Sequence, residues 1–482
     1  MTFLAKLGEQ TAVARREAKV AIQWDGKSLS YSALLASAAT LAERFADAGI
    51  GPGSVLCASF DNEPAFIVTL LAANSLGATF APIDVGLTVS EAAAFVRHCG
   101  CDLFAVGQDH VAAFSGFNGV KCVVGETGEV VSFSEPRTST RSSDSDGALV
   151  LFSSGSTGKP KAIMISHDSL IYRSEYLRDA IGLTEVDRTL CTLPLSHTHG
   201  LECLAMPTLL AGGTLLLLPP RLAFPLYVIQ ELEAQKVTFF SSIPNFYDFA
   251  VKLPSTQTPD LSALRFPFCG SAALAKATAE RFFEKYGVRI KQGYGLVELS
   301  VICLNTHDSE PIRFESVGRP IQGVEWRIAD NSREGELQVR SRALFSGYLN
   351  DAQETAKKLH DGWMLTGDLV RIDDDGLFYI VGRLDDFIKV GGLKVYAAEV
   401  EAALISLVEI RECAVIAEKD ELGSETIVAQ VVPAPDQVLD GLEAKIIAGL
   451  RPLLVDYKLP RRVIFVSSLP KSRLGKIAKG RL

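Results

Sequence analysis

The sequence contains no long uncharged apolar run and no secretory leader pattern. Its most apolar window, "LECLAMPTLLAGGTLLLLPP" at 201–220, is interrupted by Glu202, prolines and two glycines. A membrane-spanning helix needs about 20 predominantly apolar residues, so no integral membrane segment is predicted. The first twenty residues lack both an apolar core and a small-residue cleavage site. These absences predict a cytoplasmic protein.

The sequence also lacks a disulfide pattern and an excess of positive charge. The nine cysteines are an odd number and lie scattered along the chain, which favours reduced thiols in a cytoplasm over a disulfide framework. Cys99 and Cys101 form a C-x-C pair, but no second pair or histidine stands near them, so a metal site is not favoured there. The net charge of −9 argues against nucleic acid or an anionic membrane as the main partner.

What the chain does contain is a regular alternation of strand and helix patterns. At 482 residues, with 48% hydrophobic and 22% charged residues, it is long enough for two or more soluble globular domains. The segment "SYSALLASAATLAERFADAG" has apolar residues at helical spacing, begins after a cap at Ser30 and ends at Gly49. The strand pattern "SVLCASF" follows, and similar units repeat to about residue 270. Such repetition predicts an α/β fold with mostly parallel sheets.

The pattern changes after about residue 310. "GELQVRS" and "GWMLTGDLVRIDDDGLFYIVGR" have the character of short antiparallel strands joined by hairpins, and they predict a small β-barrel-like subdomain. Beyond "GRLDDFIKVGGLKV" the chain continues as a compact α+β tail. We therefore predict a large N-terminal α/β domain over 1–384 and a small mobile α+β domain over 385–482, joined by a hinge.

The stretch "LFSSGSTGKPKAIMISHDSL" at 151–170 has the composition of a phosphate-binding loop. It is not a Walker loop, because Ser153 stands where the first glycine belongs and Pro160 replaces the magnesium-binding Ser or Thr. "KAIMIS" also alternates like a strand, so the loop joins two strands. Glycines let backbone amides converge on phosphate oxygens, and hydroxyls and lysines add donors and charge; a plain Ser/Gly surface turn is the alternative. The predicted phosphate contacts are Ser153, Ser154, Gly155, Ser156, Thr157, Gly158, Lys159 and Lys161.

Further motifs follow in a fixed order: "CGSAAL", "GYGLVE", "LTGDL", "GRLDDFIKVGGLKV" and "LPKSRLGKIAKGRL". Together with the loop they resemble the adenylate-forming superfamily, which includes acyl-CoA synthetases, peptide-synthetase adenylation domains and luciferases. The resemblance covers nearly the whole chain. It implies that ATP and a carboxylic acid form an acyl adenylate and pyrophosphate, and that a pantetheine thiol then takes the acyl group.

The resemblance also implies roles for individual residues. Tyr294 would stack on adenine, Glu298 would help to hold Mg²⁺, and Asp368 would accept hydrogen bonds from both ribose hydroxyls. Lys476 would be the catalytic lysine that contacts the substrate carboxylate and the α-phosphate. The remaining implied positions are Gly270, Ser271, Ala272, Gly293, Gly295, Val297, Arg383 and Lys394 at the nucleotide, Asp385 as the hinge pivot, and Gly391 and Gly392 at the thiol tunnel.

One position departs from the family pattern. Val297 stands where the motif Y-G-x-T-E has a threonine. This removes a hydroxyl expected near the α-phosphate, a hydrogen bond worth about 1.5–3 kcal/mol. A non-catalytic AMP-binding homologue is therefore an alternative, although Lys476, Glu298 and Asp368 are all present.

The segment "LPLSHTHGLECL" resembles the part of the family that gates the acyl pocket, with His197 as the gate. His199 is expected to be packed or solvent-facing. No Asp stands here to pair an α-ammonium group, which disfavours an amino acid. "HTHG" also resembles malonyl-CoA synthetases, and Arg265 is a candidate partner for a second carboxylate, but a neutral fatty, short-chain or aryl acid fits best. The predicted pocket residues are His197, Gly200, Ile243, Asn245, Tyr247 and Val301.

The acceptor is open between CoA, which is favoured, and the phosphopantetheine of a separate acyl carrier protein. No carrier domain is expected, since the chain ends shortly after Lys476. Amide synthesis or light emission from the same adenylate has no supporting feature in the sequence. A kinase or P-loop NTPase is disfavoured by Pro160 and by the strand that follows it.

Overall fold

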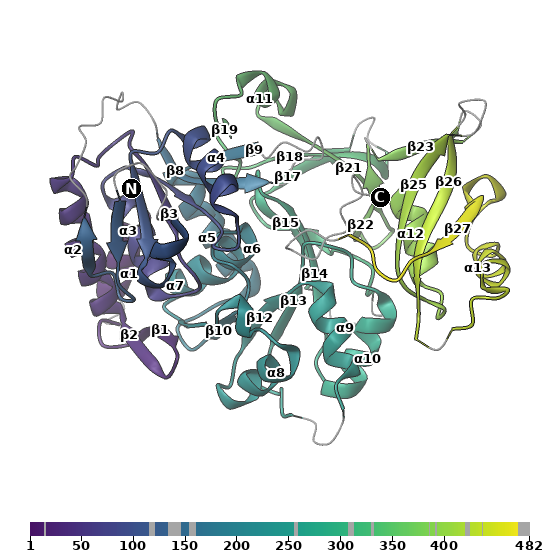
Figure 1. The fold of residues 1–482 in the computed structure, drawn as a ribbon, viewed down its shortest axis with the longest axis horizontal. Coiled ribbons are helices and arrows are strands. Elements are labelled where there is room, and N and C mark those ends of the chain that lie inside the picture. The colour runs from purple at the N-terminus through teal and green to yellow at the C-terminus, as the bar shows by residue number, and fades with distance from the viewer. Residues whose placement is uncertain are drawn as a thin grey trace.

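The computed structural model describes residues 1–13, 16–114, 121–133, 146–153, 161–254, 259–306, 313–328, 332–384, 386–390, 393–419, 425–435 and 437–470. Two large sheets, a smaller antiparallel sheet and a C-terminal lobe make up the chain (Figure 1). This is the predicted fold class of parallel-sheet layers with a small β subdomain and a separate α+β part.

The first large sheet is mixed, with a parallel centre from β11 to β14. In spatial order its strands are β16 (Arg319–Pro320), β15 (Ser300–Leu304), β14 (Lys291–Leu296), β13 (Phe266–Cys269), β12 (Phe239–Ser242), β10 (Arg188–Cys191), β11 (Thr214–Leu217), β1 (Val20–Trp24) and β2 (Lys27–Ser30).

The second large sheet is also mixed, with β4, β3, β5 and β6 running parallel. Its order is β19 (Gly347–Tyr348), β9 (Lys161–Ser166), β8 (Gly147–Ser153), β4 (Thr79–Pro82), β3 (Val55–Ser59), β5 (Leu103–Gly107), β6 (Lys121–Val124) and β7 (Val130–Phe133). Strands β8 and β9 are antiparallel neighbours, with Ser153 opposite Lys161. The candidate phosphate loop therefore joins two strands, as predicted, and not a strand and a helix.

Helices fill the space between the two sheets and cover their outer faces. The helical elements of this part are α1 (Phe3–Val13), α2 (Tyr31–Asp47), α3 (Pro64–Ser75), α4 (Val89–Cys99), the 3₁₀ turn η1 (Gln108–Phe114), α5 (His167–Ile181), α6 (Thr198–Gly200), the π turn η2 (Leu201–Ala205), α7 (Met206–Ala211), the 3₁₀ turn η3 (Pro220–Leu222), α8 (Pro225–Ala234), α9 (Pro244–Lys252), α10 (Lys276–Tyr286) and α11 (Ala352–Lys358).

Alternating strand residues show how these layers pack. Leu56 of β3 joins the core shared with α3, α5 and α7, whereas its neighbour Cys57 joins the outer core beneath α4. In the same way Cys191 of β10 faces the shared core and Leu190 faces α8, α9 and α10. Successive side chains of a strand point to opposite faces. The order of layers is therefore α4, second sheet, central helices, first sheet, and α8 to α10.

The helix predicted after Ser30 is present. Ser30 is the N-cap of α2, and its hydroxyl accepts a hydrogen bond from the backbone N–H of Ala33 at 3.2 Å. The helix ends before Gly49, whose φ of 79° suits a residue without a Cβ. Here the local signals agree with the tertiary structure, because the apolar stripe of α2 packs into the shared core.

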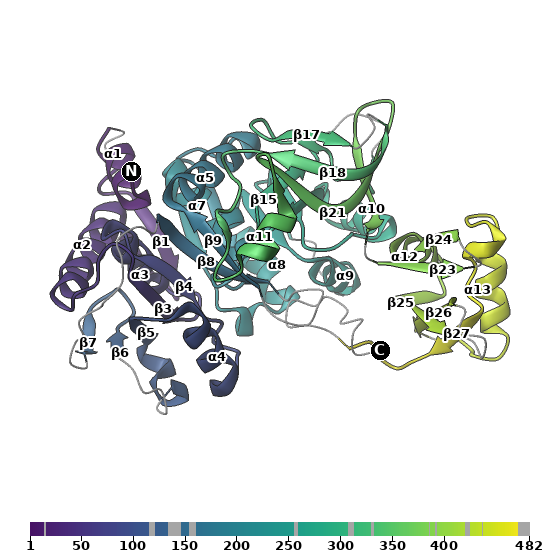
Figure 2. The ribbon, with the colours of Figure 1, turned by 90° about the horizontal axis from the view of Figure 1, so that it is seen from above.

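The smaller sheet contains β17 (Glu325–Ile328), β18 (Glu334–Arg340), β20 (Leu359–His360), β21 (Trp363–Ile372) and β22 (Phe378–Arg383), paired antiparallel. The C-terminal lobe contains β23 (Phe387–Val390), β24 (Leu393–Tyr396), α12 (Ala397–Ile405), β25 (Ile410–Lys419), β26 (Glu425–Pro433), α13 (Leu442–Leu450), the 3₁₀ turn η5 (Asp456–Lys458) and β27 (Arg462–Phe465). It has a hydrophobic core of its own and lies to one side of the rest in both views (Figures 1 and 2).

Candidate nucleotide and acyl site

The candidate site lies where β12, β13 and β14 end. These neighbours are parallel, so their carboxyl ends meet at one edge of the sheet, the usual position of a ligand in an open α/β sheet. The backbone N–H of Gly270, just after β13, donates to the carbonyl of Ser242 at 3.3 Å. Close packing requires glycine at two further predicted positions: a Cβ on Gly293 would lie 2.5 Å from the Phe268 ring, and one on Gly295 would collide with the carbonyl of Ser300.

Tyr294, Asp368 and Arg383 meet although they come from three different strands. The Tyr294 hydroxyl donates to Asp368 Oδ2 at 2.5 Å, and Arg383 Nε lies 3.7 Å from Oδ1 of the same carboxylate. Asp368 and Arg383 are direct partners in the register of β21 and β22. Burial, with the nearby Asp368 charge, raises the pKa of Tyr294 well above its usual value, so the phenol remains a donor. The structure thus gathers the three residues that the resemblance assigns to adenine and ribose.

Glu298 is fixed through both its backbone and its side chain. Its Oε1 accepts a hydrogen bond from the Tyr348 hydroxyl at 2.7 Å. Its carbonyl accepts from the Phe345 N–H at 2.7 Å and from Arg173 Nη2 at 2.8 Å. Val297, the position that departs from the family pattern, packs against the shared core.

The surroundings of Glu298 fit Mg²⁺, since a carboxylate oxygen is the ligand this ion prefers. Among the described residues there is no group of three or more Asp, Glu, His or Cys side chains placed to hold a metal.

Lys161 lies beside this carboxylate region at the start of β9. Its Nζ is 2.9 Å from Glu354 Oε2 and 4.9 Å from the centre of the Tyr348 ring. Lys161 is therefore ion-paired in this structure, and contact with phosphate would exchange Glu354 for a stronger anion.

The carboxylate of Asp84 contacts His197, the predicted acyl gate. The sequence analysis did not identify Asp84 as a site residue. His197 Nε2 lies 3.1 Å from Asp84 Oδ2, the Ser196 hydroxyl donates to the same oxygen at 3.1 Å, and the Gly86 N–H donates to Oδ1 at 2.7 Å. Burial raises the pKa of Asp84, but these hydrogen bonds outweigh it and bring the pKa to about 2. An anion therefore stands beside the gate. The available signal was the position of Asp84, two residues after the end of the parallel strand β4.

His199, expected to be a packed or solvent-facing residue, packs edge-on against the Phe268 ring at 5.8 Å between centroids and also bridges two strand ends. Its Nε2 lies 2.6 Å from the Ser241 hydroxyl, and its Nδ1 lies 3.0 Å from the Ser271 hydroxyl. The Ser241 hydroxyl also lies 3.2 Å from the carbonyl of Phe268. His199 therefore ties the acyl-gate segment to Ser271, which has a φ of 70°, and to the predicted adenine wall of Gly270, Ser271 and Ala272.

The other predicted acyl-pocket residues differ in how deeply they are buried. Ile243 and Asn245 are half-buried at the start of α9, and Gly200 is packed so closely that a Cβ would collide with the carbonyls of Leu193 and Pro194. Tyr247 is fully buried in the core under α9 and α10, where its hydroxyl donates to the carbonyl of Phe268 at 2.7 Å. Val301 is buried in the shared core.

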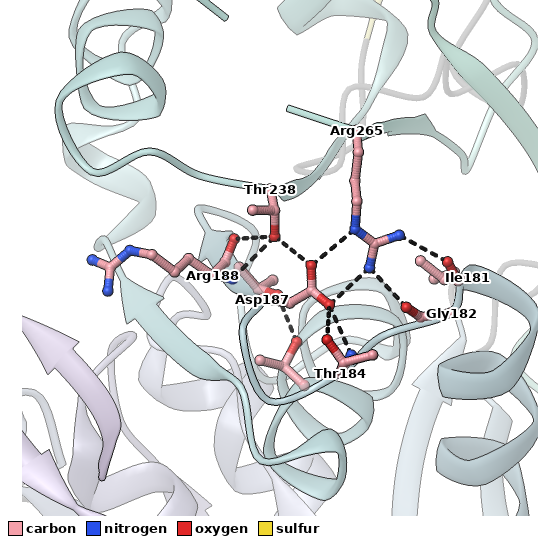
Figure 3. A network of polar contacts seen from close by, with 9 residues as sticks. Ile181, Gly182, Thr184, Asp187, Arg188, Thr238 and Arg265 are labelled. Carbon is pink, nitrogen blue, oxygen red and sulfur yellow. Dashed lines mark hydrogen bonds and ion pairs between the residues drawn. The ribbon is translucent and has the colours of Figure 1, made fainter. Parts of the chain in front are cut away.

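Arg265 is not at this edge of the sheet, which corrects the suggestion that it faces the substrate. It precedes β13, and its guanidinium contacts both Asp187 oxygens at 2.9 and 2.8 Å and the carbonyls of Ile181 and Gly182 (Figure 3). The strand runs from Arg265 towards Gly270, so these two residues lie at opposite ends of it. Arg265 is therefore a structural residue.

Several predicted residues lie outside the described part of the chain. These are Ser154, Gly155, Ser156, Thr157, Gly158 and Lys159 of the phosphate loop, together with Asp385, Gly391, Gly392 and Lys476. For Ser153 and Lys394 the structure describes the backbone but not the side chain. Their assigned roles remain predictions. Within the described residues, no helix is both long enough and apolar enough to cross a bilayer.

The cluster of Tyr294, Asp368 and Arg383 at the strand ends, the adjacent carboxylate of Glu298 and the separate C-terminal lobe form the arrangement expected of an adenylate-forming enzyme. Comparison with known families is consistent with this: a model described as AMP-binding enzyme matches residues 9–349, and one described as AMP-binding enzyme C-terminal domain matches residues 399–476. The chain belongs to the AMP-binding enzyme family. The predicted superfamily and its class of AMP-forming acid–thiol ligases are confirmed.

The chain resembles several characterised relatives over almost its whole length. It is 33% identical over 471 residues to a feruloyl-CoA synthase from Amycolatopsis sp, covering 95% of this chain and 94% of that one. It is 30% identical over 487 residues to an indoleacetate–CoA ligase from Aromatoleum aromaticum, covering 96% and 94%.

Two solved structures extend the comparison. ATP-bound MatB from Rhodopseudomonas palustris superimposes with a TM-score of 0.88 at 28% identity, covering 100% of this chain and 98% of that one. The amide bond synthetase McbA from Marinactinospora thermotolerans gives 0.87 at 28% identity, covering 99% of each.

Proposed function

We propose that this enzyme activates a neutral carboxylic acid, with aryl acids as its preferred substrates, and transfers the acyl group to CoA. The observation that carries the proposal is the meeting of Tyr294, Asp368 and Arg383 beside Glu298. It supplies an aromatic ring, a buried carboxylate and a cation for a nucleoside, next to a ligand for the metal that accompanies its phosphates.

In the first half-reaction a carboxylate oxygen of the acid attacks the α-phosphorus of ATP, and the bond to the β-phosphate bridging oxygen breaks with loss of pyrophosphate. Asp368 and Arg383 hold the ribose, which fixes the α-phosphorus relative to the acid. Glu298 would hold Mg²⁺ together with the phosphates, and the ion would supply positive charge there. We expect Lys159 and Lys161 to bind the β- and γ-phosphates, and Lys476 to contact the substrate carboxylate and the α-phosphate.

In the second half-reaction the thiolate of the pantetheine arm attacks the acyl carbonyl carbon and AMP leaves. We propose residues 1–384 as the adenylation core and residues 385–482 as a lobe that turns about Asp385. The turn withdraws Lys476 and brings Gly391 and Gly392 to the thiol path. The independent core of the lobe supports this division.

The charged side chains near His197 favour a substrate whose acyl group carries no second charge. Asp84 is an anion beside His197, and it repels a second carboxylate on the substrate. Arg265, the candidate partner for such a carboxylate, is occupied by Asp187. The aryl preference is supported by the relatives named for feruloyl and indoleacetate substrates.

The test is acid-dependent ATP–pyrophosphate exchange with Mg²⁺ across neutral aryl acids, fatty acids, dicarboxylates and amino acids. We expect exchange with aryl acids and its loss in Lys476→Ala. A second assay with CoA, a carrier protein bearing phosphopantetheine, or an amine then identifies the acceptor; the amine is included because of the likeness to McbA. ATP binding without exchange for any acid would instead support the non-catalytic alternative.

A further inference from the structure

Arg173 of α5 and Glu202 of the π turn form an ion pair inside the central helix layer. Arg173 Nη1 lies 2.8 Å from Glu202 Oε1, and the two side chains are 0% and 1% exposed. Burying two charges is costly, and apolar side chains of similar volume are often at least as stabilising. Stability alone therefore does not explain the pair.

The contacts of Arg173 converge on the segment that carries the proposed magnesium ligand. Besides Glu202, its guanidinium donates to the carbonyl of Val297 at 3.1 Å and to the carbonyl of Glu298 at 2.8 Å. Its Nε donates to the carbonyl of Ala343 at 2.7 Å. The planar guanidinium fixes three carbonyls in one arrangement, which a single ammonium group cannot do.

Two parts of the chain position the Glu298 carboxylate, and Arg173 hydrogen-bonds backbone carbonyls in both of them. One is the backbone at Val297 and Glu298, and the other is Tyr348, which hydrogen-bonds Oε1. Tyr348 belongs to the segment that begins at Ala343, and the Phe345 N–H of that segment also donates to the Glu298 carbonyl. Arg173 thus holds the carboxylate's own backbone and the segment that supplies its hydrogen-bond donor.

Glu202 connects this arrangement to the acyl gate. It lies in the π turn Leu201–Ala205, which directly follows α6, and the Leu201 N–H donates to the His197 carbonyl at 3.0 Å. Single π turns within helices occur frequently at functional sites. One oxygen of Glu202, Oε2, is buried without a hydrogen-bond partner among the described residues, so Arg173 is what keeps this carboxylate in place.

We propose that Arg173 and Glu202 are a positioning pair that fixes the Glu298 carboxylate relative to the acyl gate at His197. The pair touches neither ATP nor acid; it acts through the peptide carbonyls of Val297 and Glu298 and through the segment that carries Tyr348. The inference rests on the proposed function, because it assumes that Glu298 binds Mg²⁺ together with ATP.

The test is Arg173→Lys in the full-length protein, with ATP affinity measured by calorimetry with and without Mg²⁺. We expect the enhancement of ATP binding by Mg²⁺ to fall about tenfold, because lysine keeps the charge but not the three carbonyl contacts. The matched control is Arg265→Lys, which disturbs the Asp187 network at the other end of the sheet (Figure 3). It should lower the melting temperature and leave the enhancement within twofold of wild type.

Glu202→Gln provides a second variant if Arg173→Lys does not fold, since it preserves side-chain shape and the contacts of Arg173 with carbonyls. We expect a smaller, about threefold, loss of the magnesium enhancement. An unchanged enhancement with only a lower melting temperature would overturn the positioning role. A wild-type protein whose ATP binding is not enhanced by Mg²⁺ would contradict the proposed function and this role together. Enhancement in the wild type that is unchanged in the variants would overturn the role alone, so the two failures are distinguishable.

Discussion

The hydroxyl of Tyr294 donates directly to the carboxylate of Asp368, 74 positions further along the chain. The residue expected to stack on adenine is thereby joined to the residue expected to hold the ribose. The two ribose hydroxyls would donate to the same two oxygens, so we expect the sugar to compete with the phenol for Asp368 Oδ2 and to displace it when ATP binds.

Asp368→Asn and Tyr294→Phe should therefore have unequal effects. The asparagine loses the charged acceptor, and a hydrogen bond to a charged group is worth about 1.5–3 kcal/mol, so the KM for ATP should rise at least tenfold. The phenylalanine removes a competitor for the carboxylate and should leave that KM unchanged or lower. Asp374→Asn, at an exposed turn of the same hairpin, is the control. Equal effects of the first two variants in the exchange assay would contradict the exchange of phenol for ribose.

His199→Phe removes both hydrogen bonds that tie the acyl-gate segment to Ser241 and Ser271. The KM for ATP should rise several-fold, because Ser271 of the predicted adenine wall loses its hydrogen bond to His199. Ser271→Ala removes one of these bonds without changing the volume at His199 and should produce part of the effect. A change confined to acid specificity, measured as kcat/KM for two acids, would assign His199 to the pocket wall instead.

Val297→Thr restores the hydroxyl that the family pattern expects near the α-phosphate. Because such a bond is worth about 1.5–3 kcal/mol, the rate of pyrophosphate exchange should rise about tenfold. Val297→Ala, which trims the side chain without adding a hydroxyl, is the control. A slower Thr variant would show that packing of Val297 against the shared core matters more than the hydroxyl.

Glu63 predicts an unusual pH dependence of stability. Burial, together with the charges of Asp61, Asp109 and Glu126, raises its pKa from 4.5 to about 7, and its Oε1 is buried without a partner among the described residues. The folded state therefore binds a proton that the unfolded state releases, so its contribution is full below pH 4.5 and is lost as the pH rises through 7.

Glu63→Gln should accordingly stabilise the protein at pH 8 by up to about 3 kcal/mol, and have little effect at pH 4.5. Urea unfolding at the two pH values measures this. The exposed Glu43 of α2 provides the matched control, Glu43→Gln, which should change stability little at either pH. A stabilisation of the same size at both pH values would refute the titration argument.

The sequence predicted the fold well because local and tertiary signals agree in it. Ser30, Gly49 and the alternating strand patterns act locally, and the order of the motifs brought together Tyr294 and Asp368. It did not predict the partners that depend on sheet order. Asp84 meets His197 because β4 ends beside the gate, and Arg265 points away from the site because it precedes β13; neither fact is visible in residue spacing.

The π turn that carries Glu202 has a consequence for the insertions and deletions this chain tolerates. A π turn closes i→i+5 hydrogen bonds, here from the Met206 N–H to the Leu201 carbonyl, so it holds one residue more than an α-helix of the same rotation. Deleting a single residue from 201–205 should therefore leave a regular helix, with the wholly buried side chains of α7 still facing their neighbours. The widened turn that presents Glu202 to Arg173 would be lost, so such a deletion would remove the ion pair while sparing the packing of α7.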